Sequence, residues 1–298
     1  MKELLEKLLT LEKKLSEVVN MINKGWFNFK MPLRDWPSIN FAIETAIRDL
    51  EHGGARILFP SEFTEGKDMI LINGLIWMGS KELMVKQVNE KLTQGFHCIK
   101  LKIGALNFND ELDIIKQIRK SFPSNQLEIR VDANGAFAPK DALEKIKRLA
   151  AFELHSIEQP ILPSQIDEMA SICFNSPVPV ALDEELIGKY PVENKRRLLK
   201  MIQPQFIVIK PGIIGGIKSG EEWISIANDM NIGWWITSAL ETNIGLNAIA
   251  QWTYTLKNPM PHGLSTGFLF ENNINSPLAS IGEKLYYFPR KKWDSLFD

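Results

Sequence analysis

The sequence predicts an α/β fold of the TIM type, a (β/α)8-like barrel, and three observations support this prediction. Short apolar runs rich in β-branched residues recur from residue 70 onwards. Amphipathic stretches with helical spacing lie between most of these runs. Eight such units fit into about 200 residues, which is the size of a barrel of this kind. A doubly wound open sheet is the alternative, but that fold does not need eight units.

The expected strands and helices alternate along the chain. No GxGxxG or GxxxxGK[ST] motif follows any expected strand, so the sequence does not support nucleotide binding of those two kinds. Four clear amphipathic helices are expected at 81–93, 110–121, 140–152 and 220–230. The expected strands are Ile70–Met78, Cys98–Ile103, Leu127–Val131, His155–Ile157, Val178–Leu182, Phe206–Ile209, Trp234–Thr237 and Gly263–Leu264.

Residues 1–69 lack this alternation, and we expect them to form a partial, helical capping lobe. Residues 2–23 have a leucine-rich stripe that could form a short coiled coil. Leu5, Leu9 and Val19 widen that stripe, which favours packing against the protein's own core. A second helix is expected at 38–50. The expected domains are therefore 1–69, a barrel at 70–267, and a C-terminal segment at 268–298 that returns to the capping lobe.

The composition excludes several classes of function. The chain has 298 residues, 45% of them hydrophobic, and a formal net charge of −1. This charge gives no reason to expect nucleic acid or a membrane surface as a partner. Cys98 and Cys173 have no metal-ligand spacing, and the charged N-terminus does not resemble a signal peptide. We therefore expect a cytoplasmic protein with a small-molecule substrate, which could form a homo-oligomer.

The strand at 98–103 carries two lysines on one face. Ile99, Leu101 and Ile103 alternate with Cys98, Lys100 and Lys102. In a parallel sheet both faces are normally covered, so the lysines would point into an enclosed space. At a separation of roughly 7 Å and an effective dielectric constant near 20, their repulsion is about 2.4 kcal/mol. We therefore expect lowered lysine pKa values and a lysine that can accept a proton.

Ionisable residues end five successive strands, at intervals of 25 to 30 residues. Because each interval is about one strand–helix unit, these side chains should meet at the C-terminal mouth of the barrel, where such enzymes have their active sites. Three clustered carboxylates would repel one another, so a cation is expected. An all-oxygen ligand set favours Mg²⁺, and Mn²⁺ is the second choice. The alternative is that the aspartates cap helices and the glutamate pairs with a lysine. The five residues are Lys102, Asp132, Glu158, Asp183 and Lys210.

This arrangement indicates a particular chemistry. A cation that binds the carboxylate of a substrate makes the α-proton more acidic, because the enediolate formed by deprotonation is stabilised. Lys102 and Lys210 are expected on opposite sides of the carboxylates. One lysine could remove the proton while the other stabilises the anion.

The motifs as a set resemble the muconate-lactonizing subgroup of the enolase superfamily, which implies a modified (β/α)7β barrel. The resemblance implies that Asp132, Glu158 and Asp183 bind Mg²⁺. It also implies that Lys102 is the general acid/base, Lys100 its electrostatic neighbour, and Lys210 the residue that stabilises the enediolate. Asn134 and Glu184 would support the ligands. The motifs are Lys100-Leu101-Lys102, Arg130-Val131-Asp132-Ala133-Asn134, Ile157-Glu158-Gln159-Pro160, Leu182-Asp183-Glu184 and Ile209-Lys210-Pro211.

The last two strands resemble those of the o-succinylbenzoate synthases within this subgroup. The resemblance implies dehydration of 2-succinyl-6-hydroxy-2,4-cyclohexadiene-1-carboxylate to 2-succinylbenzoate, a lyase step of menaquinone biosynthesis. The glycines of the eighth strand could offer backbone N–H groups to an anion, or they could be ordinary turn residues. Gly215-Gly216 similarly resembles a family glycine pair, or is a loop that needs positive φ. The expected substrate contacts are Thr237, Ser238, Ser265, Thr266 and Gly267.

One departure and several alternatives remain. The family's capping domain begins with a small antiparallel sheet, and no such segment precedes the helix at 38–50, so the lobe looks truncated. An N-succinylamino or other N-acylamino acid racemase, or another enzyme similar to the muconate cycloisomerases, could use the same residues. A further alternative is a Schiff-base aldolase in which Lys210 is the nucleophile. The non-enzyme alternative is a metal-stabilised barrel that binds other proteins and assembles through the helix at 2–23. The mandelate racemase subgroup needs a histidine base late in the barrel, but the seventh expected strand has none, and His262 precedes the eighth.

Overall fold

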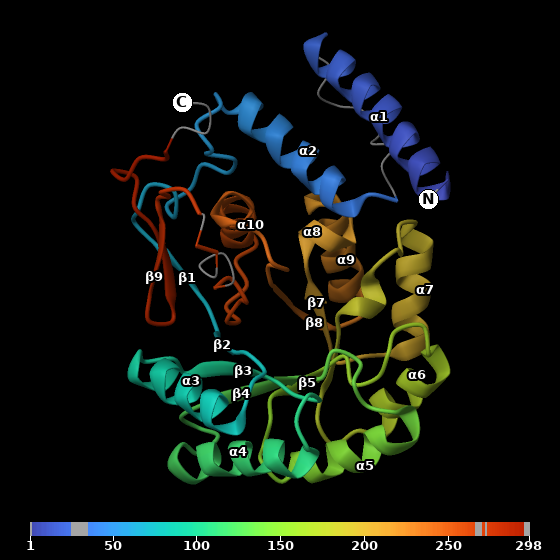
Figure 1. Cartoon of the computed structure of the whole chain (residues 1–298), viewed down its shortest axis with the longest axis vertical. Helices are drawn as coiled ribbons and strands as arrows, with labels where there is room; N and C mark the ends of the chain where they lie inside the picture. The colour runs from blue at the N-terminus through green and yellow to red at the C-terminus, as the bar shows by residue number, and fades with distance from the viewer. Residues whose placement is uncertain (1, 25–34, 266–269, 272, 295–298) are drawn as a thin grey trace.

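The computed structural model describes residues 2–24, 35–265, 270–271 and 273–294. In this part of the chain, seven parallel strands form one curved sheet in the order β2-β3-β4-β5-β6-β7-β8, with helices around its outside (Figure 1). The strands are β2 (Gly74–Ile76), β3 (Cys98–Lys102), β4 (Glu128–Asp132), β5 (Ser156–Glu158), β6 (Val180–Leu182), β7 (Phe206–Ile209) and β8 (Gly233–Ile236). The expected parallel barrel is therefore confirmed.

The helices follow the strands as the spacing predicts. The helix expected at 81–93 has those bounds, with the Ser80 side chain accepting a hydrogen bond from Leu83 N at its start. The helix expected from residue 110 begins at Phe108, because the Asn107 side chain caps it. The outer helices are α3 (Lys81–Thr93), α4 (Phe108–Ser121), α5 (Pro139–Ala150), α6 (Ile166–Asn175), α7 (Val192–Ile202), α8 (Pro211–Ile214), α9 (Ile217–Asp229) and α10 (Asn243–Thr255).

Residues 262–263 close the barrel between its first and last strands. His262 N donates to Leu71 O at 2.9 Å, and Asn73 N donates to His262 O at 2.9 Å. On the other side, Gly263 N donates to Ile236 O at 2.9 Å. The expected eighth strand at Gly263–Leu264 is thus reduced to isolated parallel bridges. These bridges nevertheless connect the first and last strands of the barrel.

The buried imidazole of His262 also joins this closure to β8, and acid should weaken it. Its Nδ1 accepts a hydrogen bond from Ile236 N at 3.0 Å, which requires that nitrogen to be unprotonated. Burial lowers the pKa of His262 to about 4, below its ordinary value of 6.5. Its contribution to stability is therefore present above pH 6.5 and is lost as the pH falls towards 4.

We expect the free energy of unfolding to fall by about 2 kcal/mol between pH 7 and pH 5 because of this residue. Urea unfolding at the two pH values measures the change. The His262→Asn variant, whose amide oxygen can accept the same N–H but does not titrate, should show a smaller dependence on pH. Equal pH dependence in the two proteins would contradict this role.

The prediction of a single strand at Ile70–Met78 is wrong. Residues 70–78 are divided between β1 (Met69–Leu71) and β2, which belong to different sheets. β1 pairs antiparallel with β10 (Lys284–Tyr287), and β10 pairs with β9 (Leu278–Ile281). The C-terminal segment therefore lies beside the chain that enters the barrel, and Tyr287 packs against Phe63 with ring centroids 6.0 Å apart. The domain boundaries at residues 69 and 267 stay predictions.

Two helices precede the barrel. The helix α1 (Lys2–Asn23) has the expected bounds, but the side chains of Leu9 and Val19 are 56% and 53% exposed. The expectation that these two residues pack against the core is therefore wrong. The helix α2 (Pro37–Glu51) buries Phe41 and Ile47 and lies beside α8 (Figure 1). No helix in the described ranges is long and apolar enough to cross a membrane.

The two faces of the barrel strands differ in character. Residues such as Ile99, Leu101 and Val131 face the helices and belong to one large apolar core. The alternating residues point into the barrel, where Val208 and Trp235 pack together. Charged side chains also point into this interior, because the same alternation that places Ile99 and Leu101 outside places Lys100 and Lys102 inside.

Candidate active site

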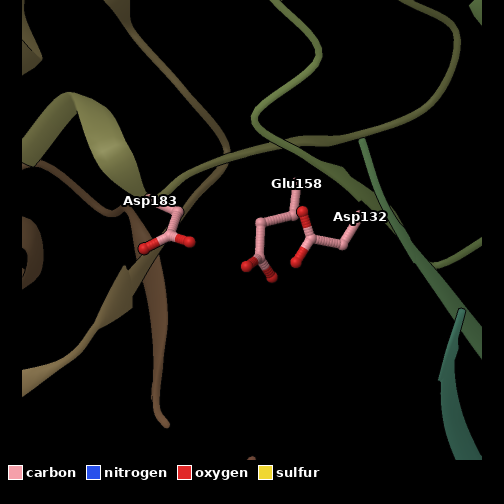
Figure 2. A group of neighbouring side chains, drawn as sticks. All are labelled: Asp132, Glu158 and Asp183. Atoms are coloured by element: carbon pink, nitrogen blue, oxygen red, sulfur yellow. The ribbon is translucent and has the colours of Figure 1, made fainter. Parts of the chain in front are cut away.

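Three carboxylates converge at the C-terminal mouth of the barrel. Asp132 ends β4, Glu158 ends β5, and Asp183 follows β6. Each of these fully buried residues offers an oxygen, and the three oxygens lie within 4.8 Å of one another. Figure 2 shows the three side chains directed into a common space from neighbouring strands. The spacing of the strand ends in the sequence had predicted this meeting.

Three lysines surround the carboxylates. Lys100 Nζ lies 2.7 Å from Glu158 Oε1 and 2.8 Å from Asp132 Oδ2. Lys102 Nζ donates to Asp132 Oδ2 at 2.6 Å, and Lys210 Nζ donates to Asp183 Oδ2. Lys102 and Lys210 are thus at opposite ends of the row of carboxylates, as predicted, with Glu158 between them.

The pKa values follow from burial and from these ion pairs. Burial raises the pKa of Glu158 to about 8, and the neighbouring carboxylate of Asp132 adds to this effect. Burial also raises the pKa of Asp183. Burial acts in the same direction on Asp132, but the ammonium groups of Lys100 and Lys102 outweigh it and hold its pKa well below the ordinary value.

The expected lowering of the pKa is wrong for Lys100, and the pKa of Lys210, for which no shift was expected, is raised as well. Burial does favour their neutral forms. The carboxylates outweigh it: Asp132 and Glu158 raise the pKa of Lys100, and Asp183 raises the pKa of Lys210. The repulsion between Lys100 and Lys102 suggested the opposite direction, because it counted the lysines without the anions between them.

Asn134 and Glu184 connect the two ends of the site. Asn134 Oδ1 accepts a hydrogen bond from Lys102 Nζ at 2.7 Å, and its amide donates to Glu184 Oε1 at 2.8 Å. The backbone N–H of Asn134 also donates to Asp132 Oδ1 at 3.0 Å. This chain of hydrogen bonds fixes the direction of the Lys102 side chain and links it to the residue after Asp183.

The expected substrate contacts are less clearly arranged. Thr237 Oγ1 and Ser238 Oγ both donate to Gly263 O, at 2.9 and 3.3 Å, so these hydroxyls join β8 to the closing segment. Ser265 is half-buried just beyond it. Thr266 and Gly267 lie outside the described residues. A role for these five residues in substrate binding stays a prediction.

Glycine is required at Gly263 and at Gly215-Gly216 for different structural reasons. Gly263 is not a turn residue: a Cβ there would lie 2.3 Å from Thr237 Oγ1, so close contact between strands requires glycine. Gly215 and Gly216 have φ values of 102° and 100°, which confirms the loop interpretation. Sequence reasoning missed Glu44 of α2, whose Oε2 would lie 2.1 Å from a Cβ at Gly216. The glycine pair marked the position, but nothing in the sequence identified its partner.

The side chains present fit a hard divalent cation. The candidate ligands are three carboxylate oxygens, which are the donors that Mg²⁺ and Mn²⁺ prefer. Three buried carboxylates so close together need positive charge nearby, which the ammonium groups of Lys100, Lys102 and Lys210 supply in part.

Residues 83–289 match the model of a family described as enolase C-terminal domain-like. The chain belongs to this family. Within the enolase C-terminal domain-like family, the chain is 51% identical over 247 residues to the o-succinylbenzoate synthase of Desulfotalea psychrophila. That match covers 83% of this chain and 67% of the relative. The resemblance inferred from the motifs is therefore confirmed.

A solved structure agrees with this placement. The crystal structure of MenC from Desulfotalea psychrophila superimposes with a TM-score of 0.82 at 46% identity, covering 91% of this chain and 74% of that one. A more distant relative is the N-succinylamino acid racemase of Thermus thermophilus, 28% identical over 166 residues, which are 56% of this chain and 42% of the relative. Membership of the enolase C-terminal domain-like family and the buried acidic triad together suggest a divalent metal ion.

Proposed function

We propose that the protein is a Mg²⁺-dependent lyase that dehydrates 2-succinyl-6-hydroxy-2,4-cyclohexadiene-1-carboxylate to 2-succinylbenzoate, a step of menaquinone biosynthesis. The observation that carries this proposal is the row of three carboxylates with a lysine at each end, in a chain 51% identical to an o-succinylbenzoate synthase. Asp132, Glu158 and Asp183 would hold Mg²⁺, or Mn²⁺ as the second choice.

The lysines then have separate tasks. Lys102 removes the proton α to the ring carboxylate, and Asn134 holds its amine in position for this step. Lys210 faces the opposite side of the substrate, where its positive charge stabilises the enediolate. Lys102, now protonated, assists loss of the hydroxyl group as water, and the ring becomes aromatic. A cation bound by the carboxylates would make the α-proton more acidic by drawing charge from the substrate carboxylate.

Lys100 has a different task. Its ammonium group contacts two carboxylates, those of Glu158 and Asp132, and lies between them. It acts as a fixed positive charge that offsets part of the charge of the carboxylates. This is the role of electrostatic neighbour that the motif resemblance implies.

The direct test is to incubate the purified protein with Mg²⁺ and the cyclohexadiene substrate and to follow the aromatic product by absorbance. We expect turnover in the usual range for enzymes, on the order of 1 to 10³ per second. Protein heated until it unfolds provides the control. A rate no higher than that of this control would refute the assignment.

A second candidate activity is racemisation of N-succinylamino acids. The placement of Lys102 and Lys210 at opposite ends of the carboxylates favours it, because proton exchange from two faces needs two opposed bases. Incubation of an N-succinylamino acid in heavy water separates the two activities. Racemisation introduces deuterium at the α-carbon, whereas absence of exchange leaves the dehydration as the activity.

A further inference from the structure

The short segment after β7 determines where Lys210 points. Lys210 is the residue immediately before α8, and Gly215 and Gly216 lead from α8 into α9. Residues 211–217 comprise α8, the two glycines and the first residue of α9. We call this segment, which directly follows Lys210, the 211–217 turn. Any shift of this turn would move the ammonium group relative to Asp183 and Glu158.

Helix α2 holds this turn through three side chains. Ser38 Oγ donates to Gly212 O at 2.7 Å, and Asn40 Nδ2 donates to Gly215 O at 2.7 Å. Glu44 Oε2 accepts a hydrogen bond from Ile217 N at 2.6 Å. All three bonds reach main-chain atoms, and they lie at the beginning, middle and end of the segment. Helix α2 thus fixes the path of the backbone.

Glu44 is the most specific of these contacts. The helix α9 begins at Ile217, and Gly216 before it has no side chain that could cap the helix, so the first N–H groups need an acceptor from elsewhere. The Glu44 carboxylate supplies one. Burial raises the pKa of Glu44 to about 7, so at pH 8 it places negative charge at the positive end of the helix. Gly216 leaves the space that this carboxylate occupies.

The turn also has contacts that do not involve α2. Ser219 Oγ donates to Ile214 O at 2.7 Å, and the buried Lys195 Nζ donates to Ser219 Oγ at 2.7 Å. Because these bonds come from α7 and α9, loss of a contact from α2 should shift the turn without unfolding it.

We propose that Ser38, Asn40 and Glu44 are positioning residues for Lys210. Helix α2 fixes the turn at 211–217 and, through it, the ammonium group that stands opposite Lys102. This inference rests on the proposed function, because it assigns Lys210 a part in the reaction. It predicts that changes in α2 lower kcat while KM and Mg²⁺ affinity stay the same.

A double-mutant cycle tests the proposal, with steady-state kinetics at pH 8 on the Mg²⁺-loaded protein. We expect Glu44→Ala to lower kcat about tenfold or more, since small misplacements of catalytic groups are costly. Glu44→Gln, which keeps an acceptor oxygen at the same reach, should recover most of the rate. In a Lys210→Ala background, Glu44→Ala should change the residual kcat by less than about twofold, because the group it positions is gone.

Two further variants serve as a control and as an independent test. Glu51→Ala removes the same charge from an exposed site on α2 and should leave kcat unchanged. Ser38→Ala removes a different bond to the same turn and should lower kcat in the same direction, which keeps the test decisive if Glu44→Ala does not fold.

The outcomes separate this proposal from the proposed function. Equal losses from Glu44→Ala in both backgrounds would show a general structural effect and overturn the positioning role. An unchanged kcat when Glu44→Ala is made in the protein that keeps Lys210 would overturn it as well. If Lys210→Ala itself keeps full activity, the role of Lys210 in the proposed function fails, and the positioning role fails with it.

Discussion

Replacement of Lys102 by alanine is expected to slow formation of 2-succinylbenzoate by about a thousandfold or more, which is within the usual range for loss of a general acid/base. The reason is that one amine is assigned both proton transfers, removal of the α-proton and assistance to the leaving hydroxyl group. Its position is fixed by Asp132 and Asn134, whereas Lys100, which also contacts Asp132, is held between Asp132 and Glu158. Product absorbance under single-turnover conditions measures the loss.

The same variant should still bind Mg²⁺. Lys102 contacts Asp132 but supplies no ligand atom, so its removal leaves the three carboxylates in place. Titration calorimetry should show an affinity no weaker than that of the unchanged protein. Lys86→Ala, at an exposed site on α3, provides the control. Activity within threefold of normal in Lys102→Ala would remove this lysine from the mechanism.

Replacement of Asp183 by alanine is expected to weaken Mg²⁺ binding by about a hundredfold and to abolish measurable turnover at low millimolar Mg²⁺. One of three converging carboxylates is lost, and the ammonium group of Lys210 loses its nearest anion. Calorimetry detects the first effect without reference to activity.

Removal of the metal should reproduce the loss reversibly in the unchanged protein. Dialysis against a chelator is expected to abolish turnover, and added Mg²⁺ should restore it. Asp167→Asn, at an exposed position on α6, should bind the ion normally. If Asp183→Ala binds Mg²⁺ as tightly as the unchanged protein while Lys102→Ala does not, the assigned roles are reversed.

The meeting of the carboxylates at the C-terminal mouth of the barrel was predictable from the sequence, because the strand–helix unit repeats at nearly constant length. The strand-ending residues 25 to 30 positions apart had to meet once the barrel closed, and Asp132, Glu158 and Asp183 do so. The division of residues 70–78 was not predictable in this way. β1 is defined by β10, whose sequence lies about two hundred positions later and has no local signal at residue 70.

The electrostatics were harder to predict than the positions. Alternation placed Lys100 and Lys102 on the correct face, but it gave no distances to the anions of the neighbouring strands. The contacts of Lys100 with Asp132 and Glu158 reversed the expected shift in its pKa. Glu44 was missed for a similar reason, since its bond to Ile217 joins positions 173 residues apart.

The ionisable groups that would carry the reaction come from consecutive strands, β3 to β7, and therefore occupy one arc of the ring. The opposite arc, made of β8, the closing residues 262–263 and β2, contributes none of them. The predicted substrate contacts Thr237 and Ser238 directly follow β8, so the proposed function places proton transfer and substrate choice on separate arcs of the barrel. Substitutions along the second arc could change which carboxylic acid is accepted while the first arc stays intact. A barrel built in this way offers natural selection a route to new substrates that does not require a new mechanism.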